Sequence, residues 1–158
     1  MEILFRGKVY RKNRRTGEYL DCGWVYGDLH HHYNGSYHTM ISNIDDVEME
    51  TRTYDVESTT VGQFVGVEDS KGKKIFVGDI VAKEGYNEKE GQWVKMFVVV
   101  FDCTGFCLKR KDTLYSFGHI ENGKCLKEYV IGNIYDSPEL IDDYANGFEK
   151  AERSVGKK

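Results

Sequence analysis

The stretch that decides the fold is VGQFVGV at residues 61–67, followed by IFVGDIV at residues 75–81. Each segment is a short apolar run with the β-branched content of a strand, and the polar residues 69–73 between them predict a turn. Gly78 and Asp79 interrupt the second segment, which is typical of a bulge or bend in a curved sheet. The pattern predicts a small β-barrel. It contains no nucleophile motif, metal cage or phosphate-binding loop.

Asp79 has a structural and a functional interpretation. In the structural one, its carboxylate accepts hydrogen bonds from backbone N–H groups of the turn. A general base or a metal ligand would need partners, but the neighbouring sequence offers no histidine and no carboxylate at a paired spacing. We favour the structural role and expect Asp79→Ala to lower stability by about 1 kcal/mol, the usual loss for a local capping contact.

The composition is typical of a chain built from hairpins. Its 158 residues include 17 glycines and one proline, and aromatic residues make up 13%. Glycine supplies the positive φ that tight turns need, and aromatic rings fit a pleated surface. The length fits one compact domain with a small appendage.

Charge and hydropathy limit the classes of function. The formal net charge of −4 argues against a protein that coats nucleic acid, although a local basic face is compatible with it. No apolar run is long enough to span a bilayer, and the N-terminus lacks a signal-peptide layout. We therefore expect no membrane association and a cytoplasmic location, in which the four cysteines are free thiols.

Further strands are predicted from apolar periodicity. They lie at residues 3–10, 19–29, 38–41, 114–117 and 129–135. The run at 93–101 is the most apolar, and we expect a central strand buried on both faces. Asn34-Gly35, flanked by Tyr33 and Tyr37, predicts a hairpin with a type I′ turn.

Two segments lack strand signals. Residues 42–60 combine acidic residues with Ser and Thr, and they predict an irregular crossing between two halves.

A short helix is predicted near the C-terminus. Its signals are Ser137 as N-cap, Pro138 at the first helical position and Glu139 near the positive helix end. Its apolar face would comprise Leu140, Ile141, Tyr144, Ala145 and Phe148. Residues 149–158 are expected to fray.

Four segments, in order, resemble the YopX family of bacteriophage and prophage proteins. They are ILFRGK at residues 3–8, GWVYGDL at 23–29, the stretch 60–81, and VIGNIYDSPEL at 130–140. The resemblance implies a phage origin and an all-β protein with an SH3-like barrel or roll in its second half. It supplies no catalytic residue. The basic turn from Arg11 to Arg15 and the three histidines at 30–32 depart from the family's pattern.

Together these observations predict a mainly β fold in three parts. Residues 1–55 form an N-terminal antiparallel hairpin layer. Residues 56–137 form the SH3-like barrel or roll that the resemblance implies. Residues 138–158 form a short C-terminal helix and a frayed tail.

The densest basic cluster lies in the turn after the first strand. The residues predicted to contact nucleic acid are Arg11, Lys12, Arg14 and Arg15. With Tyr10 and Tyr19 beside it, this hairpin suits contact with phosphates and stacking on bases. A solvated turn kept soluble by its charge is the simpler interpretation. The acidic residues between Asp45 and Glu50 would also neutralise the cluster, within the fold or in a neighbouring subunit.

Aromatic residues mark a candidate interface on or beside one hairpin. They are Trp24, Tyr26, Tyr33 and Tyr37. If the second face of that hairpin is uncovered, these side chains form an exposed patch that a partner or another copy would cover. The alternative is that Trp24 packs on the barrel.

Histidines and cysteines offer two further groups, neither of which predicts a metal or cofactor site. His30, His31, His32 and His38 place at most two ligands on one face of a strand. Cys103, Cys107, Cys125 and His119 form a possible zinc set. Burial beside a turn explains Cys103 and Cys107 more simply.

The sequence therefore predicts a non-enzymatic binding or assembly module of phage origin in the cytoplasm of a bacterial host. Its partner is an unidentified protein or another copy in a homo-oligomer. The first alternative is a nucleic-acid-binding accessory protein that uses the basic hairpin. The second is a hydrolytic enzyme, which would need a polar cleft near Asp79 or Cys103.

Overall fold

The computed structural model describes residues 2–142, and the chain divides into two compact units between Phe64 and Val65. The mainly β composition, the N-terminal hairpin layer and the short C-terminal helix are all confirmed. Nine residues separate this division from the boundary at residue 55 that the sequence suggested.

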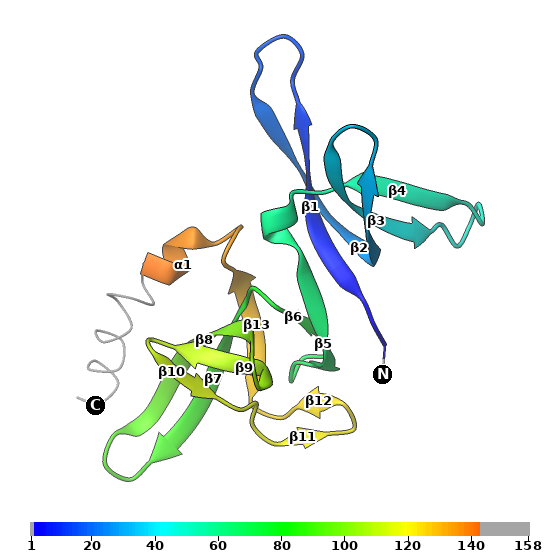
Figure 1. Cartoon of the computed structure of the whole chain (residues 1–158). Helices are drawn as coiled ribbons and strands as arrows, with labels where there is room; N and C mark the ends of the chain where they lie inside the picture. The colour runs from blue at the N-terminus through cyan, green and yellow to red at the C-terminus, as the bar shows by residue number, and fades with distance from the viewer. Residues whose placement is uncertain (1, 143–158) are drawn as a thin grey trace. The chain divides into compact units, whose positions relative to one another are not determined.

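The first unit is an antiparallel meander (Figure 1). Its strands are β1 (Phe5–Lys12), β2 (Tyr19–Tyr33), β3 (Tyr37–Ile44) and β4 (Thr51–Asp55). The first half of β2 pairs with β1 and its second half, from Asp28, pairs with β3. A 3₁₀ turn, η1 (Ser58–Thr60), leads to β5 (Gly62–Glu68), whose first residues pair with β1.

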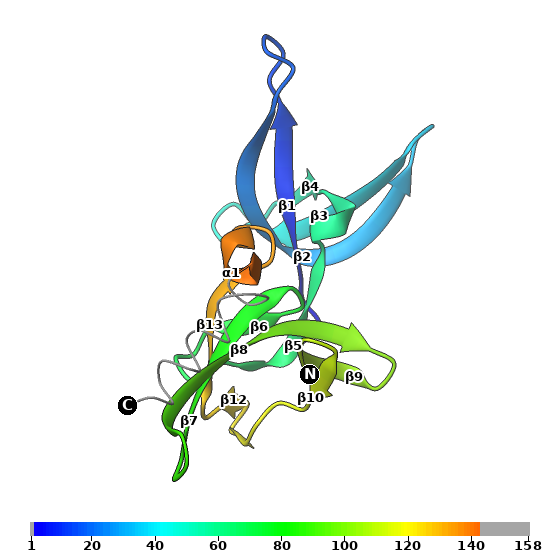
Figure 2. The same cartoon turned by 90° about the vertical axis from the view of Figure 1, so that its left-hand side faces the viewer.

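Gly27 lies where β2 changes partner. A Cβ atom at this position would collide with the backbone carbonyl oxygen of Ser42 on β3. Glycine therefore permits the close approach that lets one long strand serve two hairpins. Figure 2 shows the β1–β2 and β2–β3 hairpins diverging from the shared strand.

A small apolar core holds the first unit together. Val9, Ile41 and Val56 are buried, one each from β1, β3 and the segment after β4. Side chains packed against them are Phe5, Val25, Leu29, Tyr54 and Val61. Both hairpins meet at this cluster, while their far ends carry exposed residues.

The second unit is built around a five-stranded antiparallel sheet in the order β10-β9-β8-β7-β13. These strands are β7 (Asp79–Asn87), β8 (Gly91–Asp102), β9 (Gly105–Arg110), β10 (Thr113–Tyr115) and β13 (Glu128–Asn133). The end of β5 pairs with β6 (Lys74–Phe76) and with β12 (Lys124–Cys125), which forms a hairpin with β11 (Ile120–Glu121). The helix α1 (Pro138–Asp142) follows β13.

The core of the second unit includes the apolar stretches that the sequence marked. Its buried residues are Val65, Ile75, Val81, Phe97, Val99, Leu108 and Cys125. β8 is the central strand of the sheet, as predicted, but it is not buried on both faces. Phe97 and Val99 on one face are buried, whereas the residues of the other face are exposed or only partly buried: Val94, Met96, Val98 and Val100.

The sheet of the second unit is not closed into a barrel. Within residues 65–142, β10 and β13 form its two edges and no ladder joins them. β10 has only three residues, and the chain after it continues to β11 and β12, which pair toward β5. Closure would have needed a longer edge strand opposite β13, so the barrel expectation is corrected to an open sheet.

Two local predictions also need correction. The segment 42–60 is not irregular throughout, because β4 pairs along its length with β3. Tyr33 and Tyr37 are paired, so the hairpin loop has three residues rather than the two of a type I′ turn. Gly35 has φ +97 while Asn34 keeps a negative φ, which a type I′ turn does not allow.

The interpretation of Gly78 and Asp79 is confirmed. Gly78 has φ +92 and lies in the turn between β6 and β7. Asp79 is buried, and its Oδ2 accepts a 2.8 Å hydrogen bond from the backbone N–H of Phe76. The predicted helix begins at Pro138, but Tyr144, Ala145, Phe148 and the frayed tail lie outside the described residues.

Candidate functional site

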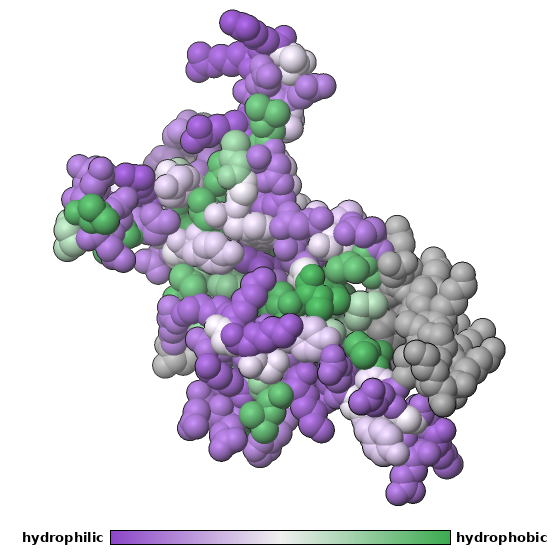
Figure 3. Space-filling model, turned by 180° about the vertical axis from the view of Figure 1, so that it is seen from behind, coloured by the Kyte–Doolittle hydropathy of each residue, from purple (hydrophilic) through white to green (hydrophobic). Residues whose placement is uncertain are grey.

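The four predicted nucleic-acid contacts lie together at the end of the β1–β2 hairpin, and we call residues 11–15 the basic tip. Asn13 fixes its shape, because Asn13 Oδ1 accepts the backbone N–H of Arg15 at 2.9 Å and the Gly17 N–H donates to the Asn13 carbonyl at 2.8 Å. Arg11, Lys12, Arg14 and Arg15 are exposed. Among residues 2–142, none of them forms an ion pair. Figure 3 shows the hydrophilic end of this hairpin.

The predicted aromatic patch is divided by the structure. Tyr33 and Tyr37 form a facing pair with ring centroids 6.2 Å apart, and they are 70% and 76% exposed. Trp24 lies nine residues before Tyr33 on β2, about 30 Å along a strand. Tyr26 is exposed opposite Arg6. The structure therefore brings two of the four residues together.

Trp24 is a packing residue of the first unit. The Arg6 guanidinium lies 4.5 Å from its ring centroid, and the Lys8 ammonium lies 5.6 Å away. Arg6 and Lys8 are themselves buried, and Lys8 forms an ion pair with Asp21. These cation–π contacts hold β1 and β2 together.

The acidic residues between Asp45 and Glu50 lie in the β3–β4 turn, and we call residues 44–50 the acidic turn. Sequence reasoning noted its charge but missed its exposed apolar side chains. Val47 and Met49 are 91% and 77% exposed, and Ile44 is also exposed. Figure 3 shows this apolar patch at the left edge of the view. The sequence signal for this exposed apolar patch was the alternation of Val47 and Met49 with acidic residues.

Hydrogen bonds fix the conformation of the acidic turn. Asp45 Oδ1 accepts the backbone N–H groups of Val47 at 2.9 Å and Glu48 at 3.1 Å. The Arg52 guanidinium pairs with Glu48 at 2.7 Å and with Asp45 at 3.1 Å. The backbone bonds, chiefly that from Glu48, hold the pKa of Asp45 below its usual value, with a smaller contribution from Arg52.

The histidines and cysteines do not gather into a ligand set. His30 bonds Ser42, and His38 bonds Asp55 and Ser36. Cys107 is buried in β9, but Cys103 is exposed in the preceding turn, so the explanation by burial is wrong for Cys103. Within the described residues, no three His, Cys, Asp or Glu side chains come close enough together to hold a metal ion.

Asp69 is a buried carboxylate that the sequence showed only as a turn residue. Its Oδ1 accepts the backbone N–H groups of Lys71 and Lys73, at 2.9 and 2.8 Å. Its Oδ2 accepts the N–H of Val130 on β13 at 2.9 Å. Asp69 therefore fixes the β5–β6 turn against β13. An Asp three residues before Gly72 was the signal for this turn.

Glu128 is a second buried carboxylate. Its Oε1 lies 3.2 Å from the Lys83 ammonium and accepts the Gly118 N–H at 2.9 Å. Burial raises the pKa of the Cys125 thiol to about 11, and the nearby carboxylates of Glu128 and Asp69 add to the shift. Cys125 is therefore a protonated core residue rather than a nucleophile.

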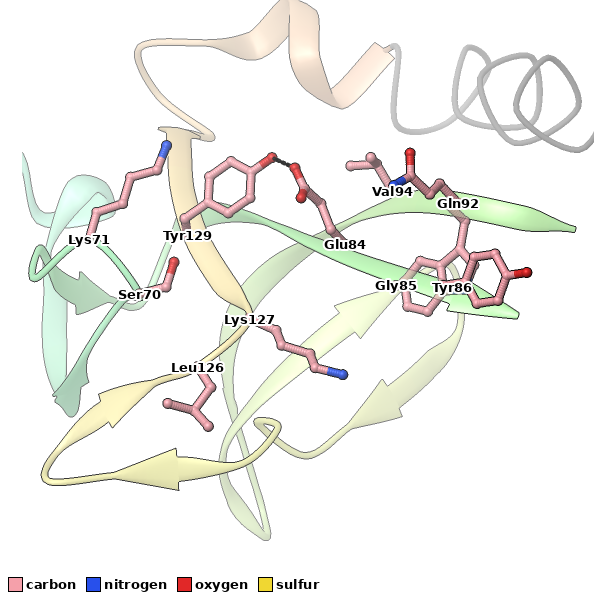
Figure 4. Close-up of a pocket in the computed structure, with 11 residues that line it drawn as sticks. Ser70, Lys71, Glu84, Gly85, Tyr86, Gln92, Val94, Leu126, Lys127 and Tyr129 are labelled. Carbon is pink, nitrogen blue, oxygen red and sulfur yellow. Dashed lines mark hydrogen bonds between the residues drawn. The ribbon is translucent and has the colours of Figure 1, made fainter. Parts of the chain in front are cut away.

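A cavity of about 730 Å³ opens on the second unit (Figure 4). Its polar and aromatic lining includes Ser70, Lys71, Glu84, Tyr86, Gln92, Lys127 and Tyr129. Tyr129 donates a 2.9 Å hydrogen bond to Glu84, which raises the pKa of the phenol. The Lys71 ammonium lies 4.3 Å from the centroid of the Tyr129 ring. Neither Asp79 nor Cys103 lines this cavity.

In the described part of the chain, no helix has the length and apolar character that crossing a bilayer requires. A comparison with curated proteins finds no match. Among solved structures, the chain is similar to the crystal structure of protein EF1440 from Enterococcus faecalis. The two share 18% identity and a TM-score of 0.47, over 89% of this chain and 99% of that one.

The comparison with family models gives the more specific result. The model described as YopX protein matches residues 5–142. This match includes both units and all thirteen strands of the described structure. The chain belongs to the YopX family.

Proposed function

We propose that this chain is a non-enzymatic binding and assembly module of phage origin that associates with further copies of itself in the cytoplasm of a bacterial host. Membership of the YopX family supports the phage origin. The observation that carries the assembly proposal is the pair of oppositely charged, exposed surfaces on the first unit: the basic tip and the acidic turn.

The two surfaces are complementary in charge and in apolar character. The basic tip carries four cations, and Tyr19 and Leu20 are exposed beside it. The acidic turn carries the exposed carboxylates of Asp46 and Glu50 beside Val47 and Met49. Opposite charges steer two copies together, and covering apolar side chains adds affinity.

The two surfaces do not neutralise each other within one copy. Arg52 pairs with two carboxylates of the acidic turn, and no ion pair joins the turn to the basic tip within residues 2–142. Figure 1 shows the β1–β2 and β3–β4 turns at separate ends of the first unit. Because the two contact surfaces differ, two copies can pair reciprocally as a two-fold dimer, or many copies can associate head-to-tail into a ring or an open filament.

Light scattering tests this assembly. We expect the wild-type chain to form particles larger than a monomer, and their mass to fall as salt is raised because the contact is electrostatic. Arg14→Glu/Arg15→Glu and Asp46→Lys/Glu50→Lys should each be monomeric at the same concentration. A matched control, Asp112→Lys/Glu121→Lys, changes exposed acidic residues of the second unit and should assemble normally. A monomeric wild-type chain at low salt would contradict the proposal.

Nucleic-acid binding is the second candidate, because the basic tip has no ion-pair partner among the described residues and Tyr19 is exposed beside it. A two-stranded hairpin has the width to enter the major groove, and its cations would contact phosphates. We expect a salt-dependent mobility shift that Arg11→Ala/Arg14→Ala/Arg15→Ala abolishes. Asp46→Lys/Glu50→Lys should keep this shift while losing assembly, which separates the two candidates.

A further inference from the structure

We propose that the cavity of the second unit binds a mononucleotide, with its base stacked on Tyr86, a base amino group at Glu84, and its phosphate at Lys127 and Lys71. This site uses none of the residues of the basic tip or the acidic turn. Ligand binding at this site would therefore be a second property of the chain, and this proposal does not depend on the proposed assembly.

One face of the β7–β8 hairpin forms the cavity wall. Tyr86 pairs with Gln92 and Glu84 pairs with Val94, so these four side chains project to the same side of the sheet. Tyr129 on β13 joins them through its hydrogen bond to Glu84. On the neighbouring rung, the Trp93 ring occupies the space that a side chain at Gly85 would need, which packs the two strands closely. The wall is therefore preformed.

The cavity has the dimensions of a small-molecule site. Its volume of about 730 Å³ lies within the range of roughly 300–1,000 Å³ found for ligand pockets. Lys71 and Ser70 enter from the β5–β6 turn, and Lys127 from the segment before β13. Figure 4 shows Glu84 between Tyr129 and the end of the hairpin that carries Tyr86.

The charges of the lining favour an anion with a phosphate group. Lys71 and Lys127 have no carboxylate partner among the described residues, and Glu84 is bonded to the Tyr129 hydroxyl instead. Two lysines and one carboxylate thus line the cavity. Lysine is a common phosphate ligand because its ammonium is a compact charge with three donors.

An exposed aromatic ring and a carboxylate favour a nucleobase as the remainder of the ligand. Tyr86 is 71% exposed, so its ring face is open to stacking. Glu84 gives one oxygen, Oε1, to the Tyr129 hydroxyl, and its other oxygen is available to accept an amino N–H. Adenine, cytosine and guanine carry an exocyclic amino group, whereas uracil does not. We therefore expect AMP, CMP and GMP to bind more tightly than UMP.

Calorimetric titration of the full chain tests the site. AMP should bind, while ribose 5-phosphate, which lacks the base, and adenosine, which lacks the phosphate, should each bind at least about tenfold more weakly. UMP should bind more weakly than AMP. Equal binding of AMP and ribose 5-phosphate would reduce the site to a nonspecific anion site and overturn the proposal, as would the absence of binding.

Variants assign the roles of the individual residues. Lys127→Ala should weaken AMP about tenfold and leave adenosine unchanged, whereas Tyr86→Ala should weaken both. Lys109→Ala removes an exposed lysine of β9 outside the cavity and should behave as wild type. Arg14→Glu/Arg15→Glu should also keep AMP binding, so that failure of the assembly proposal would not affect this one. Unchanged AMP binding in both cavity variants would overturn the assignment.

Discussion

At the scale of single residues, the second unit depends on buried carboxylates that accept backbone N–H groups. Asp79 serves the turn between β6 and β7, and Asp69 joins the β5–β6 turn to β13. The Phe76 N–H that Asp79 accepts is buried, so water cannot readily replace the carboxylate there, whereas the donors to Asp69 are partly buried.

Replacement of Asp79 should therefore cost more than the sequence suggested. We expect Asp79→Ala to lower the free energy of unfolding by about 2 kcal/mol, because the buried Phe76 N–H would lose the carboxylate that accepts it. Asp79→Asn keeps an acceptor oxygen, so its free energy of unfolding should fall less than that of Asp79→Ala. Urea unfolding of the three proteins measures the difference, and equal midpoints for wild type and Asp79→Ala would refute it.

The four cysteines should react with a thiol reagent in a fixed order. Cys22 and Cys103 are exposed, whereas Cys107 and Cys125 are buried. The hydrogen bond to Asp102 raises the pKa of Cys103, so at pH 8 less of it is the reactive thiolate than for an unshifted thiol. We expect Cys22 to react first, Cys103 second and faster as the pH rises, and the buried pair only on unfolding.

Mass spectrometry of the labelled chain at successive times gives this order. Cys22→Ser should remove the fastest phase and leave the Cys103 phase unchanged. Rapid labelling of Cys125 in the folded chain would contradict the burial that raises its pKa.

At the scale of elements, the bend in β2 depends on one close approach. Gly27→Ala would place a methyl group against the Ser42 carbonyl, whereas a Cβ at Gly23 meets no atom within 4 Å. Gly23 has φ +88, where a side chain is strained, and Gly27 has φ +159, close to extended backbone, so Gly23→Ala measures a conformational cost without a collision. We expect a loss of about 1 kcal/mol for Gly23→Ala and about 3 kcal/mol for Gly27→Ala, measured by thermal unfolding. Equal losses would show that the approach to Ser42 carries no cost.

The Tyr33–Tyr37 pair gives a test of the surface predicted from the aromatic residues. We expect Tyr33→Ala/Tyr37→Ala to leave the mass of the assembly unchanged, because the contact between copies uses the basic tip and the acidic turn. The same light-scattering measurement decides this. Dissociation of the assembly in this variant would contradict this prediction and would indicate that the interface lies on the β2–β3 hairpin.

Local sequence patterns predicted the elements but not their long-range pairing. The apolar runs at 61–81 and 93–101 specify strands, because burial and β-branched content act locally. β4 was missed, since its single partner β3 leaves it exposed and without an apolar pattern. Barrel closure depends on hydrogen bonding between the edge strands β10 and β13, and no local sequence pattern predicts whether two distant strands pair.

Among the candidate sites too, those made of consecutive residues were predictable, and those assembled from distant segments were not. The basic tip was predictable, because its residues are consecutive in one turn. The cavity was not, since Lys71, Glu84 and Lys127 come from separate segments that only the sheet brings together. The acidic turn was visible as charge, but the exposure of Val47 and Met49 depends on the conformation that Asp45 and Arg52 fix.

At the scale of the whole molecule, the two units have separate cores and are assigned separate roles. The first unit carries the charged surfaces proposed for assembly, and the second carries the cavity proposed for a mononucleotide. Variants of one unit should therefore leave the property of the other intact, because the residues concerned belong to units with separate cores.

The most direct test mixes the two charge-reversed proteins. A variant with Arg11, Lys12, Arg14 and Arg15 all changed to Glu presents two acidic surfaces. Asp46→Lys/Glu50→Lys presents two basic ones, because Asp45 and Glu48 stay paired with Arg52. Neither protein can therefore associate with itself. In an equimolar mixture, each surface meets its complement again. Light scattering should show monomers for each protein alone and restored assembly for the mixture. A mixture that stays monomeric, while the wild-type chain assembles under the same conditions, would contradict the pairing of the basic tip with the acidic turn.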